Sequence, residues 1–167
     1  MNNKRIGWMM GLGFGVCAGI FYLGNLLTVD PADISGNGNP AFLGLFFLFF
    51  FILFFMLGWM ELMANVRTRL LWSGFLVLPL IFVAAYRYQM NEFDRYRTYV
   101  KDIVMNQVGR GDLDYANSIT SDVFSIYMNN QLFNVNTFFM YVGLTLWIGI
   151  ALMLWHRSPF MQPKLNR

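Results

Sequence analysis

Few side chains in this sequence have the type and spacing that chemistry requires. Cys17 is the only cysteine and His156 the only histidine, so an internal disulfide, a cysteine-rich metal site and a histidine cluster are all excluded. Cys17 lies deep in an apolar run, where we expect an inert thiol with a structural role. His156 follows the last apolar run and is interpreted as a residue at the membrane interface.

A carboxylate within a membrane helix would be a second kind of functional signal, because such groups couple transport to protons or cations. Glu61 is the only acid near the end of the second apolar run, and Arg67 and Arg69 follow it closely. This neighbourhood favours a surface carboxylate. No other ionisable residue lies inside an apolar run, so the sequence does not favour a pump, a proton relay or a voltage sensor.

Three aspartates, Asp112, Asp114 and Asp122, could hold a divalent cation loosely. Their spacing lacks the glycine and the terminal glutamate of a calcium-binding loop, and neither a nucleophile nor a histidine stands beside them. The tripeptide at 110–112, Arg-Gly-Asp, matches a cell-adhesion motif, but a helix end followed by a helix cap also explains it. We therefore expect no catalytic residue, no cofactor and no dedicated metal site.

The clearest pattern concerns packing. Glycine recurs every fourth residue within an apolar run, at Gly7, Gly11, Gly15 and Gly19. On a helix each such step advances about 40° beyond a full turn, so the four glycines form one slowly drifting groove. In a membrane, small residues let a second helix approach closely. The sequence predicts a helix-packing interface here, and its neighbour could be this chain's own second or fourth helix, a second copy, or another subunit.

The composition is typical of a membrane protein. Apolar residues make up 57% of the 167 residues and charged residues 13%, against about 25% charge in ordinary soluble domains. Four apolar runs are each long enough for a membrane span, at about 6–27, 41–62, 70–86 and 135–155. The first could be a signal peptide, but its length and the missing small-residue cleavage site favour a retained helix. We predict a single all-α integral membrane domain.

Residues 87–134 are too polar to continue within the membrane. Apolar residues at three- and four-residue steps predict an amphipathic helix over 87–108, and a second helix is expected over about 114–131. Together they predict a helical hairpin lying on or near the membrane surface. Its polar side supplies the predicted partner surface, which consists of Arg95, Lys101, Asp102, Asp112, Asp114 and Asp122.

Basic residues predict the orientation. Four spans place the N-terminus, the turn at 63–69 and the C-terminal tail on one side, with seven basic residues against one acid, and leave five basic and eight acidic residues on the other. Positive residues gather on the cytoplasmic side, so we expect both termini to be cytoplasmic and residues 87–134 to be extracytoplasmic. The net charge of +3 is too small to indicate nucleic-acid binding.

Three functions remain open from the sequence. The leading hypothesis is a non-catalytic membrane subunit or regulator that packs through the glycine helix against a membrane protein and presents the hairpin to a partner. The first alternative is a homo-oligomeric channel or pore built on the glycine pattern. The second is a membrane enzyme acting on a lipid or quinone, in which a segment such as 127–130, Tyr-Met-Asn-Asn, could bind a headgroup.

Overall fold

The computed structural model describes residues 3–33, 35, 38–107 and 113–158, and within these ranges it contains helices and no strand. Four helices are long and apolar enough to cross a membrane. They are α1 (Asn3–Leu26), α2 (Phe42–Leu62), α3 (Thr68–Asp102) and α6 (Val135–His156). The predicted all-α, multi-pass architecture is confirmed at this level, and the long helices begin close to the expected positions.

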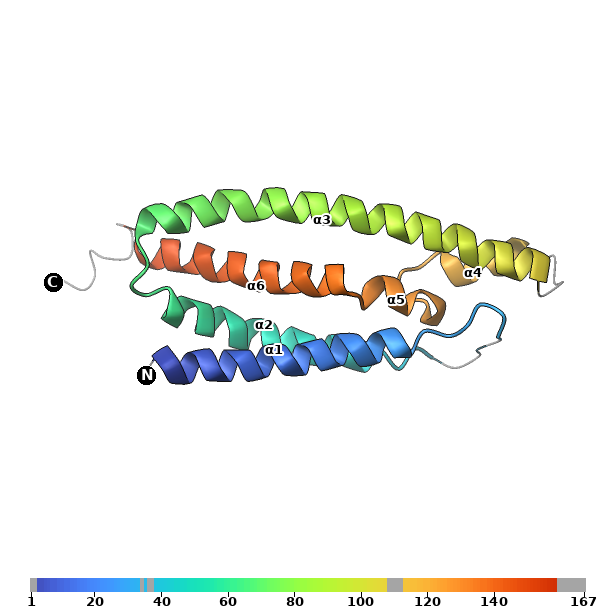
Figure 1. The fold of residues 1–167 in the computed structure, drawn as a ribbon, viewed down its shortest axis with the longest axis horizontal. Coiled ribbons are helices and arrows are strands. Elements are labelled where there is room, and N and C mark those ends of the chain that lie inside the picture. The colour runs from blue at the N-terminus through green and yellow to red at the C-terminus, as the bar shows by residue number, and fades with distance from the viewer. Residues whose placement is uncertain (1–2, 34, 36–37, 108–112, 159–167) are drawn as a thin grey trace.

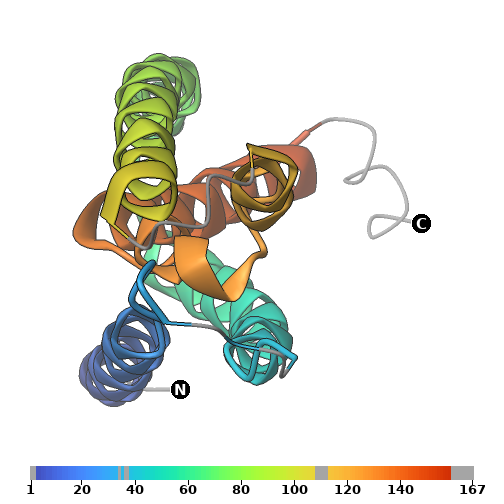
Figure 2. The ribbon, with the colours of Figure 1, turned by 90° about the vertical axis from the view of Figure 1, so that its right-hand side faces the viewer.

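The long helices pack in the order α1, α2, α6, α3, each against the next. Seen along the bundle, α3 lies on one side of α6, and α1 and α2 lie next to each other on the other side (Figure 2). The start of α1 and the end of α6 share one end of the molecule, and the short helices occupy the other (Figure 1). The two outer helices therefore each have a broad face that no other long helix covers.

Hydrogen bonds and close packing join the central pair, because apolar burial gives little drive between helices already solvated by lipid. The Tyr141 hydroxyl donates to the Leu48 carbonyl at 2.9 Å, and the Trp59 indole donates to Thr145 Oγ1 at 3.3 Å. Gly149 lets the backbones approach, since a Cβ added there would lie 2.7 Å from the Cβ of Trp59.

Helix α3 runs through Pro79 without ending. Proline has no N–H, so the carbonyl of Phe75, four residues earlier, loses its helical partner. The indole N–H of Trp147 on α6 donates to that carbonyl at 3.1 Å. The same indole stacks on the Phe75 ring, with centroids 5.3 Å apart. A side chain of the neighbouring helix thus replaces the hydrogen-bond donor that the proline lacks.

The structure corrects the expected division of residues 87–108. The predicted separate helix at the membrane surface is wrong, because α3 continues along one axis for 35 residues to Asp102 and ends in a π-helical turn, η1 (Ile103–Gln107). No glycine or proline follows Pro79 until Gly109, so loss of hydrophobicity alone does not stop the helix. At about 1.5 Å per residue, α3 exceeds an apolar core of about 30 Å.

The second helix of the predicted hairpin is also interrupted. In place of one helix over 114–131 there are α4 (Leu113–Thr120), a single 3-10 turn η2 (Ile126–Met128) and α5 (Asn129–Leu132). The Asp122 side chain accepts a hydrogen bond from the backbone N–H of Phe124 at 2.9 Å. Such local bonds from serine, threonine and aspartate compete with helical bonds, which explains why the helix ends at Thr120.

Arg157 holds the opposite end of the bundle together. Its guanidinium donates to the carbonyls of Met63, Ala64 and Val66, at 3.0, 2.7 and 2.6 Å, and to Thr68 Oγ1 at 3.2 Å. The first carbonyls lie just beyond α2, where a helix leaves its last acceptors without internal partners. One side chain after α6 therefore caps α2 and fixes the turn into α3.

We expect Arg157→Ala to lower the free energy of unfolding by about 2 kcal/mol, because charge-assisted hydrogen bonds are the stronger ones. Arg157→Lys should recover only part of this, since an ammonium cannot reproduce the guanidinium fork. The control is Arg95→Ala, which removes an exposed ion pair with Glu92 of 2.8 Å and should cost under about 0.5 kcal/mol. Denaturation in micelles measures all three, and equal losses for Arg157→Ala and Arg95→Ala contradict the capping role.

Candidate interaction surfaces

The glycine stripe, defined as Gly7, Gly11, Gly15 and Gly19, faces away from the rest of the molecule. All four residues are exposed, and a Cβ added at any of them would meet no described atom within 4 Å. Packing of the stripe against this chain's own second or fourth span, one of the neighbours left open by the sequence, is therefore wrong for the part of the chain that the structure describes. The stripe is an open groove on the outer side of α1.

The packed face of α1 is a different one. It consists of Ile6, Met10, Gly13, Cys17, Phe21 and Gly24, all of them buried. Gly13 lies against Phe54 and Gly24 against Phe133, where an added Cβ would come within 2.9 and 2.5 Å of the rings. Cys17 is completely buried on this face, which agrees with a structural thiol turned away from the stripe.

Large apolar side chains border the stripe. Trp8 is 77% exposed near one end and Tyr22 66% exposed near the other, with Leu12 and Val16 also exposed between them. No charged side chain occurs on α1 between Arg5 and its end. A shallow groove between large apolar neighbours is suited to receive another helix, because small residues allow close backbone approach.

The second surface belongs to the cap, defined as residues 87–107 and 113–134, at the end of the bundle away from the start of α1 (Figure 1). Its interior contains Val100, Val104, Ala116 and Met128, all fully buried or nearly so. Tyr127 is also buried, and its hydroxyl donates to the Asp33 carbonyl at 3.0 Å and accepts from the Ser35 N–H at 2.8 Å. These bonds fasten the cap to the loop that joins α1 and α2.

An amide pair makes the same connection. Asn129, completely buried, accepts a hydrogen bond from Asn39 at 2.6 Å and donates back to it at 3.1 Å. Asn129 also donates to the Leu27 carbonyl at 3.2 Å, and Asn39 donates to the Phe124 carbonyl at 2.8 Å. Sequence reasoning missed this pair, because its two members are 90 residues apart. Tyr127, Met128 and Asn129 are buried, so three of the four side chains of the 127–130 segment lie in the interior of the cap.

The predicted partner surface is only partly brought together. Arg95 pairs with Glu92, and Asp102 accepts a hydrogen bond from Asn106 one turn later. Among the members that the structure describes, Lys101 makes a contact between elements, since its ammonium donates to Asn117 of α4 at 2.6 Å. Asp114 and Asp122 are exposed. Asp112 lies outside the described residues.

Burial affects the titration of one phenol in the cap. Burial raises the pKa of Tyr96, beyond the apolar run of α3, and a side-chain hydrogen bond with Asn130 offsets part of that rise. The phenol is therefore neutral at physiological pH. Within the described ranges, no three histidine, cysteine, aspartate or glutamate side chains gather where they could hold a metal ion.

Comparison with known proteins gives no relative: no family model, no curated protein and no solved structure matches this chain.

Proposed function

We propose that this protein is a non-catalytic subunit or regulator of a membrane complex, which packs through the glycine stripe against another membrane protein and presents the cap to a partner. The observation that carries the proposal is the outward direction of the stripe. One face of α1 is already filled by α2 and by Phe133, yet a Cβ added at any of the four glycines on the other face would meet no described atom within 4 Å. Glycine inside a helix costs about 1 kcal/mol relative to alanine, so a close neighbour outside the chain explains the stripe.

The proposed topology places the cap outside the cytoplasm and both termini inside it. It rests on the seven basic residues at one end of the four spans and the acidic excess at the other. Because the cap is fastened to the first loop by Tyr127 and Asn129, it presents a fixed polar surface. Arg95, Asp102, Asp114 and Asp122 are its exposed charged members from the predicted set.

Double replacement of Gly11 and Gly15 by leucine tests the proposal. A Cβ added at either position would meet no described atom within 4 Å, so the monomer should keep its fold while the leucine side chains fill the groove and the complex is lost. We expect at least a tenfold drop in the membrane protein that co-purifies in mild detergent after crosslinking. Ala84→Leu, on the exposed side of α3, adds similar bulk and should leave co-purification unchanged. A wild-type protein that is monomeric and without partners contradicts the proposal.

A homo-oligomeric channel is the second candidate, favoured by the same outward stripe if the neighbour is another copy. The double leucine variant then abolishes both the oligomer and ion flux into liposomes. Wild-type oligomers without flux would leave assembly in place and remove the channel. The exposed residues beside the stripe, Trp8, Leu12 and Val16, are apolar and offer no water-filled lining, so the subunit role is the better supported of the two.

A further inference from the structure

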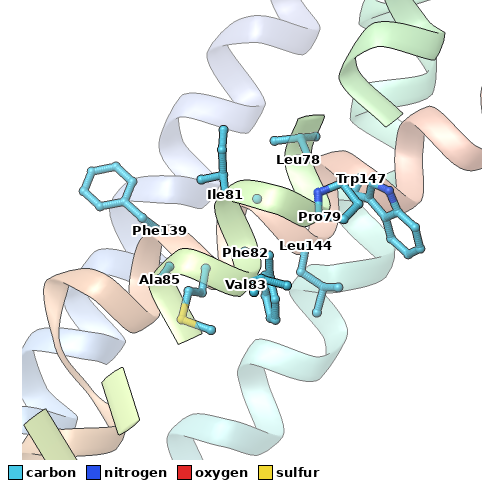
Figure 3. Close-up of a pocket in the computed structure, with 11 residues that line it drawn as sticks. Leu78, Pro79, Ile81, Phe82, Val83, Ala85, Phe139, Leu144 and Trp147 are labelled. Atoms are coloured by element: carbon cyan, nitrogen blue, oxygen red, sulfur yellow. The ribbon is translucent and has the colours of Figure 1, made fainter. Parts of the chain in front are cut away.

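A cavity opens between α3 and α6 within their apolar segments. It has a volume of about 340 Å³, and all the residues around it are apolar, including Pro79, Phe82, Ala85, Gly143 and Trp147 (Figure 3). This volume lies at the lower limit of small-molecule sites, which begin at about 300 Å³. The cavity is not part of either interaction surface, because it is formed by α3 and α6 and the stripe lies on α1.

Side-chain contacts join the two helices on both sides of the cavity, and little side-chain volume lies between these contacts. On one side, Trp147 stacks on Phe75 and bonds to its carbonyl. On the other side, Asn136 of α6 donates to the Ala85 carbonyl at 3.1 Å and to Gln89 Oε1 at 3.0 Å. Between these contacts lies Gly143, where an added Cβ would meet no described atom within 4 Å.

Size and chemistry restrict what can fill this space. Water needs polar partners, which the lining does not offer. A transmembrane helix, about 10 Å across, is too wide for a space of this volume. An empty space would forfeit the dispersion contacts of its whole lining. A flexible apolar chain needs no polar partners, is narrow enough for this space and supplies the missing dispersion contacts. The bilayer contains such chains at this depth.

The two ends of the cavity differ, which suggests how such a chain would lie. Beyond Ala85 and Met140 come the buried amide of Gln89 and the half-buried amide of Asn136, which bond to each other, and α3 becomes charged from Arg87 onward. At the other end the apolar cluster of Leu71, Ile150 and Met153 follows. The polar end matches the glycerol and headgroup of a lipid, and the apolar end matches its tail.

We propose that the cavity between α3 and α6 is a binding site for one acyl chain of a bilayer phospholipid, with the glycerol end beside Gln89 and Asn136. The site is independent of the proposed subunit role, since it uses neither the stripe nor the partner surface of the cap. It makes a resident lipid part of the packing between the two helices, in the stretch between the Trp147 and Asn136 contacts.

Gly143→Leu tests the site by filling it from α6. The matched control is Val77→Leu, at a half-exposed position of α3 that does not line the cavity. Each purified protein is delipidated and titrated with phosphatidylethanolamine, and bound lipid is counted by native mass spectrometry. We expect one lipid on the wild type and on Val77→Leu, and at least tenfold weaker binding by Gly143→Leu. Equal binding by all three proteins overturns the proposal, because the lipid is then only annular.

A second measurement covers the case in which Gly143→Leu folds poorly. In a protein that keeps Trp147 as its only tryptophan, phospholipids brominated along one acyl chain should quench its fluorescence by at least half in vesicles. Adding Val77→Leu should preserve this quenching, and Ala85→Leu, which fills the cavity from α3, should remove most of it. Absence of quenching in the otherwise unchanged single-tryptophan protein overturns the proposal, as does a co-purifying protein segment that protects Trp147 in place of lipid.

Discussion

Gly24→Ala is expected to lower the free energy of unfolding by about 2–3 kcal/mol, whereas Gly15→Ala should leave it unchanged or raise it slightly. The two substitutions add the same methyl group to the same helix. At Gly24 the new Cβ would lie 2.5 to 2.7 Å from three ring atoms of Phe133, at the stem of a ring that is 1% exposed. At Gly15 it would meet no described atom within 4 Å.

The ring of Phe133 cannot move away cheaply. The ring also lies edge-on to Phe21, with ring centroids 5.7 Å apart. The backbone carbonyl of Phe133 accepts a hydrogen bond from Asn25 at 2.8 Å. Relief of the clash must therefore displace α1 from the short helices of the cap. Phe133 is the point at which the membrane helices meet the cap, so a local overpacking there affects both.

Denaturant titration in micelles, followed by tryptophan fluorescence, measures the pair of variants. A loss of stability for Gly24→Ala with none for Gly15→Ala supports the assignment of an inner and an outer glycine face. Comparable losses for both variants contradict it, because the stripe would then be packed within the monomer. The Gly15→Ala protein can also be used in the co-purification experiment, because a single added methyl group keeps the groove nearly flat.

The long helices could be predicted closely because the membrane allows so few backbone conformations. A span must satisfy its own hydrogen bonds, so the apolar runs at 6–27 and 135–155 correspond to α1 (Asn3–Leu26) and α6 (Val135–His156) within a few residues. The predicted C-terminal end is wrong only for the helix of the third run. Its apolar part stops near Tyr86, but no helix breaker occurs between Pro79 and Gly109, so the helix continues beyond the predicted end.

The direction of α1 could not be predicted from its sequence. The helix is apolar on nearly all sides, so hydrophobic periodicity does not distinguish lipid from protein. Helix α1 contains two sets of glycines, and the predicted packing interface is based on the more regular set at 7, 11, 15 and 19. The structure uses Gly13 and Gly24 inside the chain instead. The packing role of these two glycines depends on their neighbours, because each faces a phenylalanine ring that an added Cβ would approach too closely.

Loss of the amide pair should be the most damaging polar substitution in the cap. We expect Asn129→Ala to destabilise the protein by about 2–3 kcal/mol, because it removes a completely buried amide and takes these partners from the Leu27 carbonyl and the Asn39 amide. Asn39 also accepts a hydrogen bond from the N–H of Ala41 at 3.0 Å, just before α2 begins. The substitution therefore loosens the first loop, the start of α2 and the cap together.

Hydrogen exchange followed by mass spectrometry distinguishes this local loosening from general unfolding. In Asn129→Ala the peptides covering 27–41 and 121–134 should exchange at least tenfold faster, while those of α3 and α6 within their apolar runs keep their protection. Asn106→Ala removes an exposed amide that donates to Asp102 on the same stretch of helix and should change neither stability nor exchange. If the two variants behave alike, the cap is held by Tyr127 and by apolar packing, and the partner surface does not depend on the amide pair. If Asn129→Ala alone loosens the loop, the fixed position of the cap follows from one contact across 90 residues of chain.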